Sequence, residues 1–496
     1  MRIAILLLLV GLSACGGGGG SSAPGPNPPQ SPPPPPPPPP VTTIGDLAEY
    51  KFVGENPNDY LGYWVSSAGD VDGDGLDDVL AGAYDDDGSS PGAAYLILGK
   101  DLAANGTFNI ATAAYKFVGE DDGDWAGFVV SGANLDGDGL SDILIGAYGD
   151  ADKGPITGAA YVVFASSLGA SAVVDLANAD YKFIGEDQDD YAGYALSGAG
   201  DVDGDGLDDI LIGASGHDAG GNNAGAGYLI LASSLGANKL IDLSQADYKF
   251  VGETEQDWAG YQITTAGDVD GDGLDDLVLG SDGDDGGTQA HASYIVLGSS
   301  LGTDTVIDLS QANYKFLGEN SYDYASQVST AGDVDGDGLD DIIIGAAGHD
   351  DAGNLAGAAY IVRGSSLGAD AVIDLSTADY KFTGENPGDY AGATVADAGD
   401  VDGDGLGDIL VGALNYSATY TDQGAAYIVL GKSLGSNRNI SLEQADQKLI
   451  GEFTEQFTGV SVASAGDVNG DGLDDIVLGA YDGPDWKGAA YIVISD

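Results

Sequence analysis

The chain has 496 residues, of which 80 are acidic and 15 are basic, so its formal net charge is −65. This excess of negative charge argues against nucleic-acid binding, because contacts to phosphate depend on lysine and arginine. The only cysteine is Cys15, which excludes an intrachain disulfide.

The beginning of the chain predicts secretion. Arg2 precedes an apolar run from Ile3 to Val10, and Leu12-Ser-Ala-Cys15 follows. A charged start with a short apolar stretch is typical of a signal peptide and is too short to span a membrane as a helix. Leu-Ser-Ala-Cys resembles the bacterial lipobox, in which cleavage precedes the cysteine and its thiol is acylated. We therefore expect a lipoprotein-type signal peptide at residues 1–14 and a lipidated Cys15.

This anchor implies a location. The protein is expected to be secreted across the inner membrane and lipid-anchored at the bacterial cell surface or outer membrane. An ordinary signal peptide with an incidental cysteine is the alternative.

Residues 15–40 have the composition of a tether. Five glycines follow Cys15, and prolines fill all nine positions from 32 to 40. Glycine runs are flexible, whereas this proline run in a polyproline II helix would span roughly 28 Å. Neither composition builds a core, so we expect the segment to hold a domain formed by residues 41–496 away from the membrane.

A nine-residue pattern then recurs seven times. Its first copy, Asp-Val-Asp-Gly-Asp-Gly-Leu-Asp-Asp, runs from Asp70 to Asp78, and the copies start 64 to 67 residues apart. Calcium is bound by roughly six to eight oxygen atoms, often from carboxylates at alternate positions of a tight loop. Glycine allows the sharp curl because it adopts positive φ without steric cost. The first, third, fifth and ninth side chains and the seventh backbone carbonyl of each copy are therefore predicted to bind about seven Ca²⁺ ions.

The predicted calcium ligands are, copy by copy, Asp70, Asp72, Asp74, Leu76 and Asp78; Asn134, Asp136, Asp138, Leu140 and Asp142; Asp201, Asp203, Asp205, Leu207 and Asp209; Asp268, Asp270, Asp272, Leu274 and Asp276; Asp333, Asp335, Asp337, Leu339 and Asp341; Asp400, Asp402, Asp404, Leu406 and Asp408; and Asp467, Asn469, Asp471, Leu473 and Asp475.

The copies vary in a way that fits coordination. The ninth residue is always Asp, while the first changes only to Asn134 and the third only to Asn469, and both replacements keep a side-chain oxygen. The eighth residue also occurs as Ser141 and Gly407, so it is not predicted to be a ligand. An EF-hand is excluded, because it needs a glutamate at the twelfth position and flanking helices, whereas the first copy has Ala81 there. Acidic turns without metal are the alternative.

Short strands surround each loop. In the third repeat, residues 191–199, 209–214, 227–231 and 248–252 are strand-like and bounded by Gly, Asp and Asn turns. Four such strands, repeated seven times, predict an all-β, seven-bladed β-propeller with four antiparallel strands per blade. The repeats begin with a fourth-strand sequence and end with a third-strand one. We therefore expect residues 49–54 to form the outer strand of the last blade and close the ring, which removes the exposed edge.

These motifs resemble the FG-GAP family, the seven-bladed propeller of integrin α chains and of many bacterial surface proteins. The resemblance covers residues 41–496 and rests on the Asp-rich loop, a glycine before it such as Gly193, and Gly-Ala after it. The namesake Phe and Pro are replaced, for instance by Ala192 and Ser215, and Ser326 replaces the first glycine in the fifth repeat. The resemblance implies calcium loops on one face of the propeller and partner binding by loops of the opposite face.

The loops that join the second strand to the third differ most between repeats, which is typical of a binding surface on a constant scaffold. Free drift of these loops is the alternative. We predict a calcium-binding, surface-anchored adhesion module that presents variable loops to a protein or glycan partner. A lectin-like propeller with repeated sugar sites and, third, a surface hydrolase are the other hypotheses. Nucleic acid is not an expected partner, and the membrane is contacted only through the lipid anchor.

No catalytic site is predicted. The histidines His217, His291 and His349 all fall in second-to-third loops of consecutive repeats, where turns favour them. No nucleophile elbow or phosphate-binding lysine loop is present. Replacing all three histidines is therefore expected to leave partner binding unchanged. The repeated tyrosines, such as Tyr191 and Tyr228, are expected to pack the blades together.

Overall fold

The computed structural model describes residues 42–84, 91–102, 104–283, 291–481 and 486–495. The predicted signal peptide, Cys15 and the tether lie outside these residues and stay predictions. Within the described part of the chain, no helix has the length and apolar character needed to cross a membrane.

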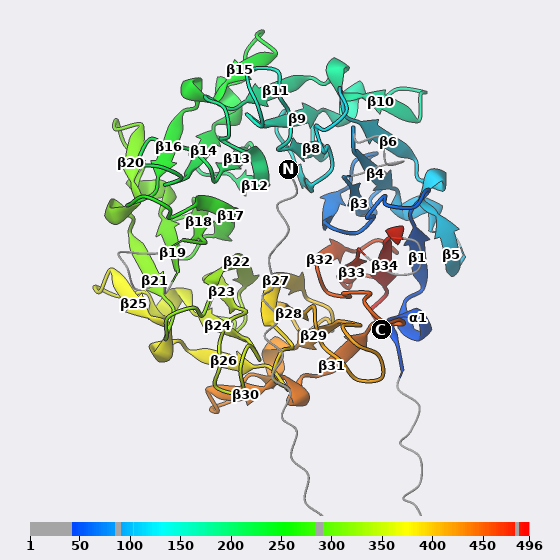
Figure 1. Ribbon diagram of the computed structural model, residues 1–496, viewed down its shortest axis with the longest axis vertical. Helices are drawn as coiled ribbons and strands as arrows, with labels where there is room; N and C mark the ends of the chain where they lie inside the picture. Colours follow the sequence, from blue (N-terminus) through cyan, green and yellow to red (C-terminus); the bar gives the residue numbers. More distant parts are fainter. Residues whose placement is uncertain (1–41, 85–90, 103, 284–290, 482–485, 496) are drawn as a thin grey trace, which may run out of the picture. The chain divides into compact units, whose positions relative to one another are not determined.

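Seven β-sheets follow one another around a ring, which confirms the predicted seven-bladed β-propeller (Figure 1). In each blade the first strand lies nearest the centre, and the second, third and fourth strands pair antiparallel further out, as in β12–β13–β14–β16. The second strand, Asp209–Ala214 in this blade, is buried along its whole length. It is apolar on both faces because a neighbouring blade covers each of them.

From the centre outwards, the first blade contains β2 (Val65–Gly69), β3 (Asp78–Ala83), β4 (Ala93–Ile97), β6 (Tyr115–Val118) and β10 (Val173–Asp175). The second contains β7 (Val129–Ala133), β8 (Asp142–Ala147), β9 (Ala159–Val163), β11 (Tyr181–Ile184) and β15 (Leu240–Asp242). The third contains β12 (Ala192–Gly200), β13 (Asp209–Ala214), β14 (Ala226–Ile230), β16 (Tyr248–Val251) and β20 (Val306–Asp308). The fourth contains β17 (Ala259–Gly267), β18 (Asp276–Ser281), β19 (Ala292–Val296), β21 (Tyr314–Leu317) and β25 (Val372–Asp374).

The fifth blade contains β22 (Ala325–Gly332), β23 (Asp341–Ala346), β24 (Ala358–Val362), β26 (Tyr380–Thr383) and β30 (Asn439–Ser441). The sixth contains β27 (Ala391–Gly399), β28 (Asp408–Ala413), β29 (Ala425–Val429) and β31 (Gln447–Ile450). The seventh contains β32 (Val462–Gly466), β33 (Asp475–Ala480), β34 (Ala489–Val493), β1 (Tyr50–Val53) and β5 (Gly106–Asn109). A short helix, α1 (Ile44–Leu47), precedes β1, and three-residue 3₁₀ turns follow third and fifth strands, as at Gly364–Ser366 and Leu375–Thr377.

Six of the seven blades contain a fifth strand, whereas four strands per blade were predicted. In six sheets a short segment of a following repeat pairs parallel with the outer side of the fourth strand. In the third blade, Ile307 lies opposite Phe250, and Leu309, two residues after Ile307, is buried in the same cluster as Phe250. The sequence does not reveal this strand, because three residues are too few to display a strand alternation.

The predicted ring closure is confirmed. β1 pairs antiparallel with β34, with Tyr50 opposite Ile492 and Val53 opposite Ala489, so the blue and red ends of the coloured chain meet in one sheet (Figure 1). The strand spans 50–53 within the predicted 49–54. It is not the outermost strand, because β5 pairs with its outer side.

A partly buried ion pair joins each blade to the next. The lysine of a fourth strand reaches the glutamate that follows the fourth strand of the preceding blade, and it lies over a buried tyrosine of its own third strand. In the third blade, Lys249 Nζ is 2.7 Å from Glu186 Oε1 and 5.5 Å from the centre of the Tyr228 ring. The seven pairs are Lys51–Glu452, Lys116–Glu55, Lys182–Glu120, Lys249–Glu186, Lys315–Glu253, Lys381–Glu319 and Lys448–Glu385. The third-strand tyrosines such as Tyr228 thus pack the blades, as expected, whereas Tyr191 lies directly before the first strand of its blade, on the loop from the fourth strand of the preceding one.

Candidate metal centres and the opposite face

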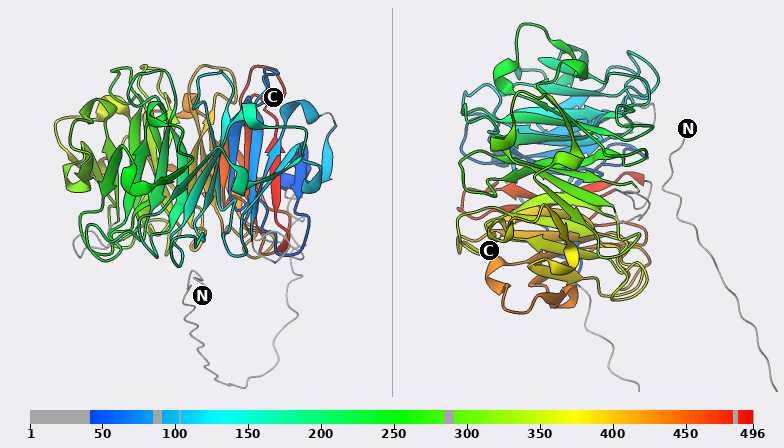
Figure 2. Two further views of the ribbon diagram at one scale, coloured as in Figure 1. Left: turned by 90° about the horizontal axis from the view of Figure 1, so that it is seen from above. Right: turned by 90° about the vertical axis from the view of Figure 1, so that its left-hand side faces the viewer.

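The seven Asp-rich loops join the first strand of each blade to its second. Because the strands alternate in direction, these loops all lie on one face, the cation-loop face. The loops from second to third strand and from fourth to first strand lie on the other face, here called the opposite face. Figure 2 shows the strands running between the two sets of loops.

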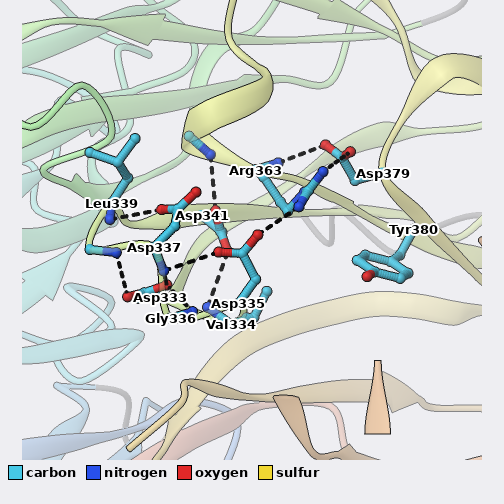
Figure 3. Close-up of polar contacts among 12 residues, drawn as sticks. Asp333, Val334, Asp335, Gly336, Asp337, Leu339, Asp341, Arg363, Asp379 and Tyr380 are labelled. Carbon is cyan, nitrogen blue, oxygen red and sulfur yellow. Dashed lines mark hydrogen bonds and ion pairs between the residues drawn. The ribbon is translucent and has the colours of Figure 1, made fainter. Parts of the chain in front are cut away.

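Backbone hydrogen bonds to the first carboxylate curl each loop. In the fifth blade, Asp333 Oδ1 accepts from the amides of Gly336 at 2.7 Å and Asp337 at 3.1 Å, while Oδ2 accepts from Gly338 at 2.8 Å (Figure 3). The φ angles of Gly336 and Gly338 are 77° and 88°, which a side chain would strain. The predicted role of the two glycines is therefore confirmed.

The ninth residue is the buried anchor of the loop. Asp341 is fully buried, and its two oxygens accept from the amides of Val334 at 3.1 Å and Gly364 at 2.9 Å. The corresponding pair of bonds is present in all seven loops. Burial raises the pKa of Asp341 to about 7, so an adjacent cation would strongly favour the ionised form.

The fold brings predicted ligands together. Oxygen atoms of three carboxylates lie within 4.8 Å of one another in the first, third and fourth loops. The grouped residues are Asp70, Asp72 and Asp74; Asp201, Asp203 and Asp205; and Asp268, Asp270 and Asp276. These oxygen-only donor sets suit a hard cation such as Ca²⁺ better than a softer metal. In the fifth, sixth and seventh loops the first carboxylate likewise accepts from loop amides, whereas in the second loop Asn134 Oδ1 accepts from Gly137 N at 3.1 Å. The ligand role of the leucine carbonyl remains a prediction.

The eighth residue, which was not predicted to be a ligand, links neighbouring loops. Asp340 Oδ2 accepts from Asp268 N at 2.9 Å, and Asp340 N donates to Asp268 O at 3.2 Å. The same two bonds join Asp77 to Asp467, Asp208 to Asn134, Asp275 to Asp201 and Asp474 to Asp400. Ser141 and Gly407 keep the backbone bond and lack the carboxylate. Sequence reasoning missed this inter-blade clip, although the acidic bias of the position was its signal.

Three loops have a basic side chain beside the carboxylate of their third residue. Lys100 pairs with Asp72 and Lys432 with Asp402. Arg363 Nη1 lies 2.6 Å from Asp335 Oδ2 (Figure 3). A cation bound in these three loops would share that carboxylate with a fixed positive charge.

On the opposite face, one aromatic residue per blade occupies a left-handed backbone conformation. We call these residues the aromatic crown: Tyr60, Trp125, Tyr191, Trp258, Tyr324, Tyr390 and Phe457, with φ between 52° and 58°. A buried residue holds each turn, as where Asp323 Oδ2 accepts from Asn320 N at 2.8 Å just before Tyr324. A bulky residue in this conformation costs of order 1–3 kcal/mol. The fold maintains that strain seven times at matching positions.

A second aromatic group lies three residues further on, in four consecutive blades. It consists of Tyr63, Phe128, Tyr194 and Tyr261, whose successive ring centres are 5.0, 4.9 and 5.2 Å apart. The corresponding residues of the remaining blades are Gln327, Ala393 and Val460. This second group is therefore continuous over the first four blades, and Tyr481 of the seventh blade joins it at Tyr63, with ring centres 5.7 Å apart.

The histidines each pair with a different carboxylate. Nδ1 of His217 lies 3.2 Å from Asp190, that of His291 lies 3.3 Å from Asp282, and that of His349 lies 3.1 Å from Asp323. The structure does not bring them into one shared site among the described residues.

A sequence model described as "FG-GAP repeat" matches residues 192–230, 259–296, 324–362, 392–429 and 458–493. These five stretches run from the first to the third strand of blades three to seven.

Several curated relatives are integrin α chains. Integrin alpha pat-2 of Caenorhabditis briggsae is 32% identical over 236 residues, which are 46% of this chain and 18% of that protein. Integrin alpha-PS2 of Drosophila melanogaster is 32% identical over 35% of this chain and 12% of its own length. Integrin alpha-5 of Xenopus laevis is 26% identical over 51% of this chain and 22% of its own length. The chain thus spans less than a quarter of the length of these relatives.

Proposed function

We propose that this chain, whose FG-GAP repeats build a seven-bladed propeller similar to integrin α chains, is a calcium-stabilised module that binds a protein ligand on the opposite face. Binding, and not catalysis, is the function we infer from these relatives. The proposal includes the lipid anchor at Cys15 and display at the bacterial surface, for which the Leu-Ser-Ala-Cys motif and the proline-rich tether are the support.

Calcium has a structural role in this proposal. The ninth carboxylate is buried and the first accepts three amide hydrogens, so a bound cation would fix each loop and, through the eighth-residue clip, its neighbour. Extracellular modules bind calcium with dissociation constants of roughly 10⁻⁴–10⁻³ M. Occupancy at such concentrations stabilises the folded state by mass action.

The aromatic crown is the observation that carries the binding proposal. Backbone strain that a fold maintains at matching positions points to function. Tyr324 is 39% exposed, and the other six crown residues are partly buried. Aromatic residues are enriched in protein interfaces because they bury a large area at little entropic cost. The second aromatic group, from Tyr63 to Tyr261, runs continuously over four blades, which favours one large site over seven equivalent sugar sites.

The test compares Tyr324→Gly with Val372→Ser. Glycine at 324 removes the ring and relieves the φ of 56°, while Val372, which is 58% exposed on a fifth strand, is a control away from the opposite face. Both variants and the parent protein are applied in millimolar calcium to an array of extracellular-matrix proteins and glycans, and their melting temperatures are recorded.

We expect the parent protein to bind one protein ligand at a ratio of one to one. Tyr324→Gly should bind it at least tenfold more weakly with an unchanged melting temperature, and Val372→Ser should bind it as the parent does. Unchanged binding with a lower melting temperature for Tyr324→Gly would assign the crown a packing role and contradict the proposal. Several equivalent glycan sites per chain would support the lectin-like alternative.

A further inference from the structure

We propose that the opposite face carries one transition-metal site of the zinc class, formed by Glu319, His349 and Asp351. Ligand atoms of these three residues lie within 4.8 Å of one another. The site is separate from the oxygen-only cation loops, and it does not depend on the proposed binding function.

The imidazole of His349 is oriented as in a metal ligand. The residue is fully buried, and its Nδ1 lies 3.1 Å from Asp323 Oδ2, which fixes the Nδ1–H tautomer when the ring is neutral. Metal-binding histidines generally donate their second ring N–H to a carboxylate in this way. The remaining nitrogen, Nε2, is therefore left with a lone pair.

That lone pair has no hydrogen-bond donor. Nε2 is buried and makes no hydrogen bond of acceptable geometry, although Asp351 Oδ2 lies 3.2 Å away. An imidazole nitrogen and a carboxylate oxygen at this distance repel while the nitrogen keeps its lone pair, and the contact becomes favourable when Nε2 carries a proton or when both atoms share a bound cation. One imidazole and two carboxylates, completed by water, match the donor sets of Zn²⁺ and Co²⁺ and differ from the all-oxygen sets of Ca²⁺.

The ammonium group of Lys381 competes with a metal ion for the two carboxylates of the site. Its Nζ lies 2.6 Å from Asp351 and 3.0 Å from Glu319, so the ammonium offsets one of the two negative charges when no metal is bound. A pocket of about 500 Å³, lined by Glu319, Asp351, Lys381 and Arg438 among others, adjoins the site and gives an ion a path of entry and the lysine room to withdraw. The proposal therefore predicts that removing the ammonium tightens metal binding.

The third blade provides a matched control. Its loop has the same Gly-His-Asp sequence, and His217 Nδ1 lies 3.2 Å from Asp190, but Ala219 stands where the fifth blade has Asp351. The third blade thus has a buried histidine beside one carboxylate without the second carboxylate, and it is predicted not to bind.

The experiment titrates Co²⁺ into the propeller saturated with calcium, so that the cation loops are filled, and follows the visible absorption bands of bound Co²⁺. We expect one Co²⁺ per chain, loss of the bands in His349→Gln, and unchanged bands in His217→Gln. Lys381→Met should bind Co²⁺ about tenfold more tightly. Absence of the bands from the parent protein, or bands that survive His349→Gln, would overturn the proposal.

Two further variants keep the test decisive if His349→Gln does not fold. Asp351 has a side chain that is 60% exposed, so Asp351→Ala should fold and yet lose the site. Ala219→Asp should create a second Co²⁺ site in the third blade. Unchanged Co²⁺ binding by Asp351→Ala would contradict the assignment of this carboxylate as a ligand.

Discussion

Without calcium, the stability of the propeller should fall as the pH rises from 5 to 7.5. Burial raises the pKa of the ninth-position carboxyl to about 7 in six loops and to about 6 at Asp408. An unfolded Asp titrates near pH 4, at about 3.9. Between these values the native state holds protons that the unfolded state has lost, so the free energy of unfolding decreases with increasing pH. The stabilisation is fully present below pH 4 and is lost as the pH passes through 7.

The magnitude follows from the burial of these carboxyls. One pH unit within this window changes the free energy of unfolding by about 1.4 kcal/mol per carboxyl. The step from pH 5 to pH 7 therefore costs roughly 2–3 kcal/mol per loop. A few loops suffice to remove much of the roughly 5–15 kcal/mol by which a folded domain is stable.

Calcium should reverse this trend, because a bound cation favours the ionised carboxylate. Binding near pH 6.5 should then release about five protons per chain, since a group of pKa 7 is about three-quarters protonated at that pH. The anchor variant Asp341→Asn, which does not titrate, should release about one proton fewer.

The assay uses residues 41–496, freed of divalent cations on a chelating resin and melted at several pH values between 5 and 7.5, with and without millimolar calcium. Proton release is measured in unbuffered solution, and bound ions, about seven by the coordination argument, are counted by native mass spectrometry. A cation-free melting temperature that stays constant or increases from pH 5 to 7.5, or calcium binding without proton release, would refute the reasoning.

Three contacts between or within blades yield further predictions. Lys249→Met leaves a half-buried glutamate without its partner and should lower the free energy of unfolding by about 3 kcal/mol. The control Lys239→Met, at a lysine that is 66% exposed, should lower it by under about 1 kcal/mol. Equal denaturation midpoints for the two variants would contradict this prediction. Asp340→Ala removes an inter-blade clip and should lower the free energy of unfolding by roughly 1 kcal/mol, and Ser141→Asp should add a clip and raise it by a similar amount. Urea unfolding measures both, and a change of the opposite sign in either variant would argue against the clip. Deleting residues 42–54 removes β1 from the seventh blade and should abolish the cooperative melt, while a cooperative melt near the parent temperature would show that closure by β1 is dispensable.

The sequence alone determined the repeat, the blade number and the curl of the cation loops. Seven copies can be compared with one another, so positions that tolerate only oxygen-bearing replacements, such as Asn134 and Asn469, stand out from the variable eighth position. The structure of the loop is also local. Its internal hydrogen bonds join residues at most seven apart in sequence, as between Val334 and Asp341, and the bond from Gly364 to Asp341 is the exception. Short-range geometry of this kind is fixed by glycine and Asp spacing.

Only the tertiary structure decided which repeats contact one another and through which atoms. The clip between Asp268 and Asp340 joins residues 72 apart in sequence, and the ion pair of Lys249 with Glu186 joins residues 63 apart. The fifth strand is too short to have a pattern, and the left-handed φ of the aromatic crown arises from turns anchored on buried side chains, such as Asp323 before Tyr324 and Gln456 before Phe457. Sequence periodicity reports which face of a strand is buried, whereas contacts such as that of His349 Nε2 with Asp351 depend on how the loops of a closed ring meet.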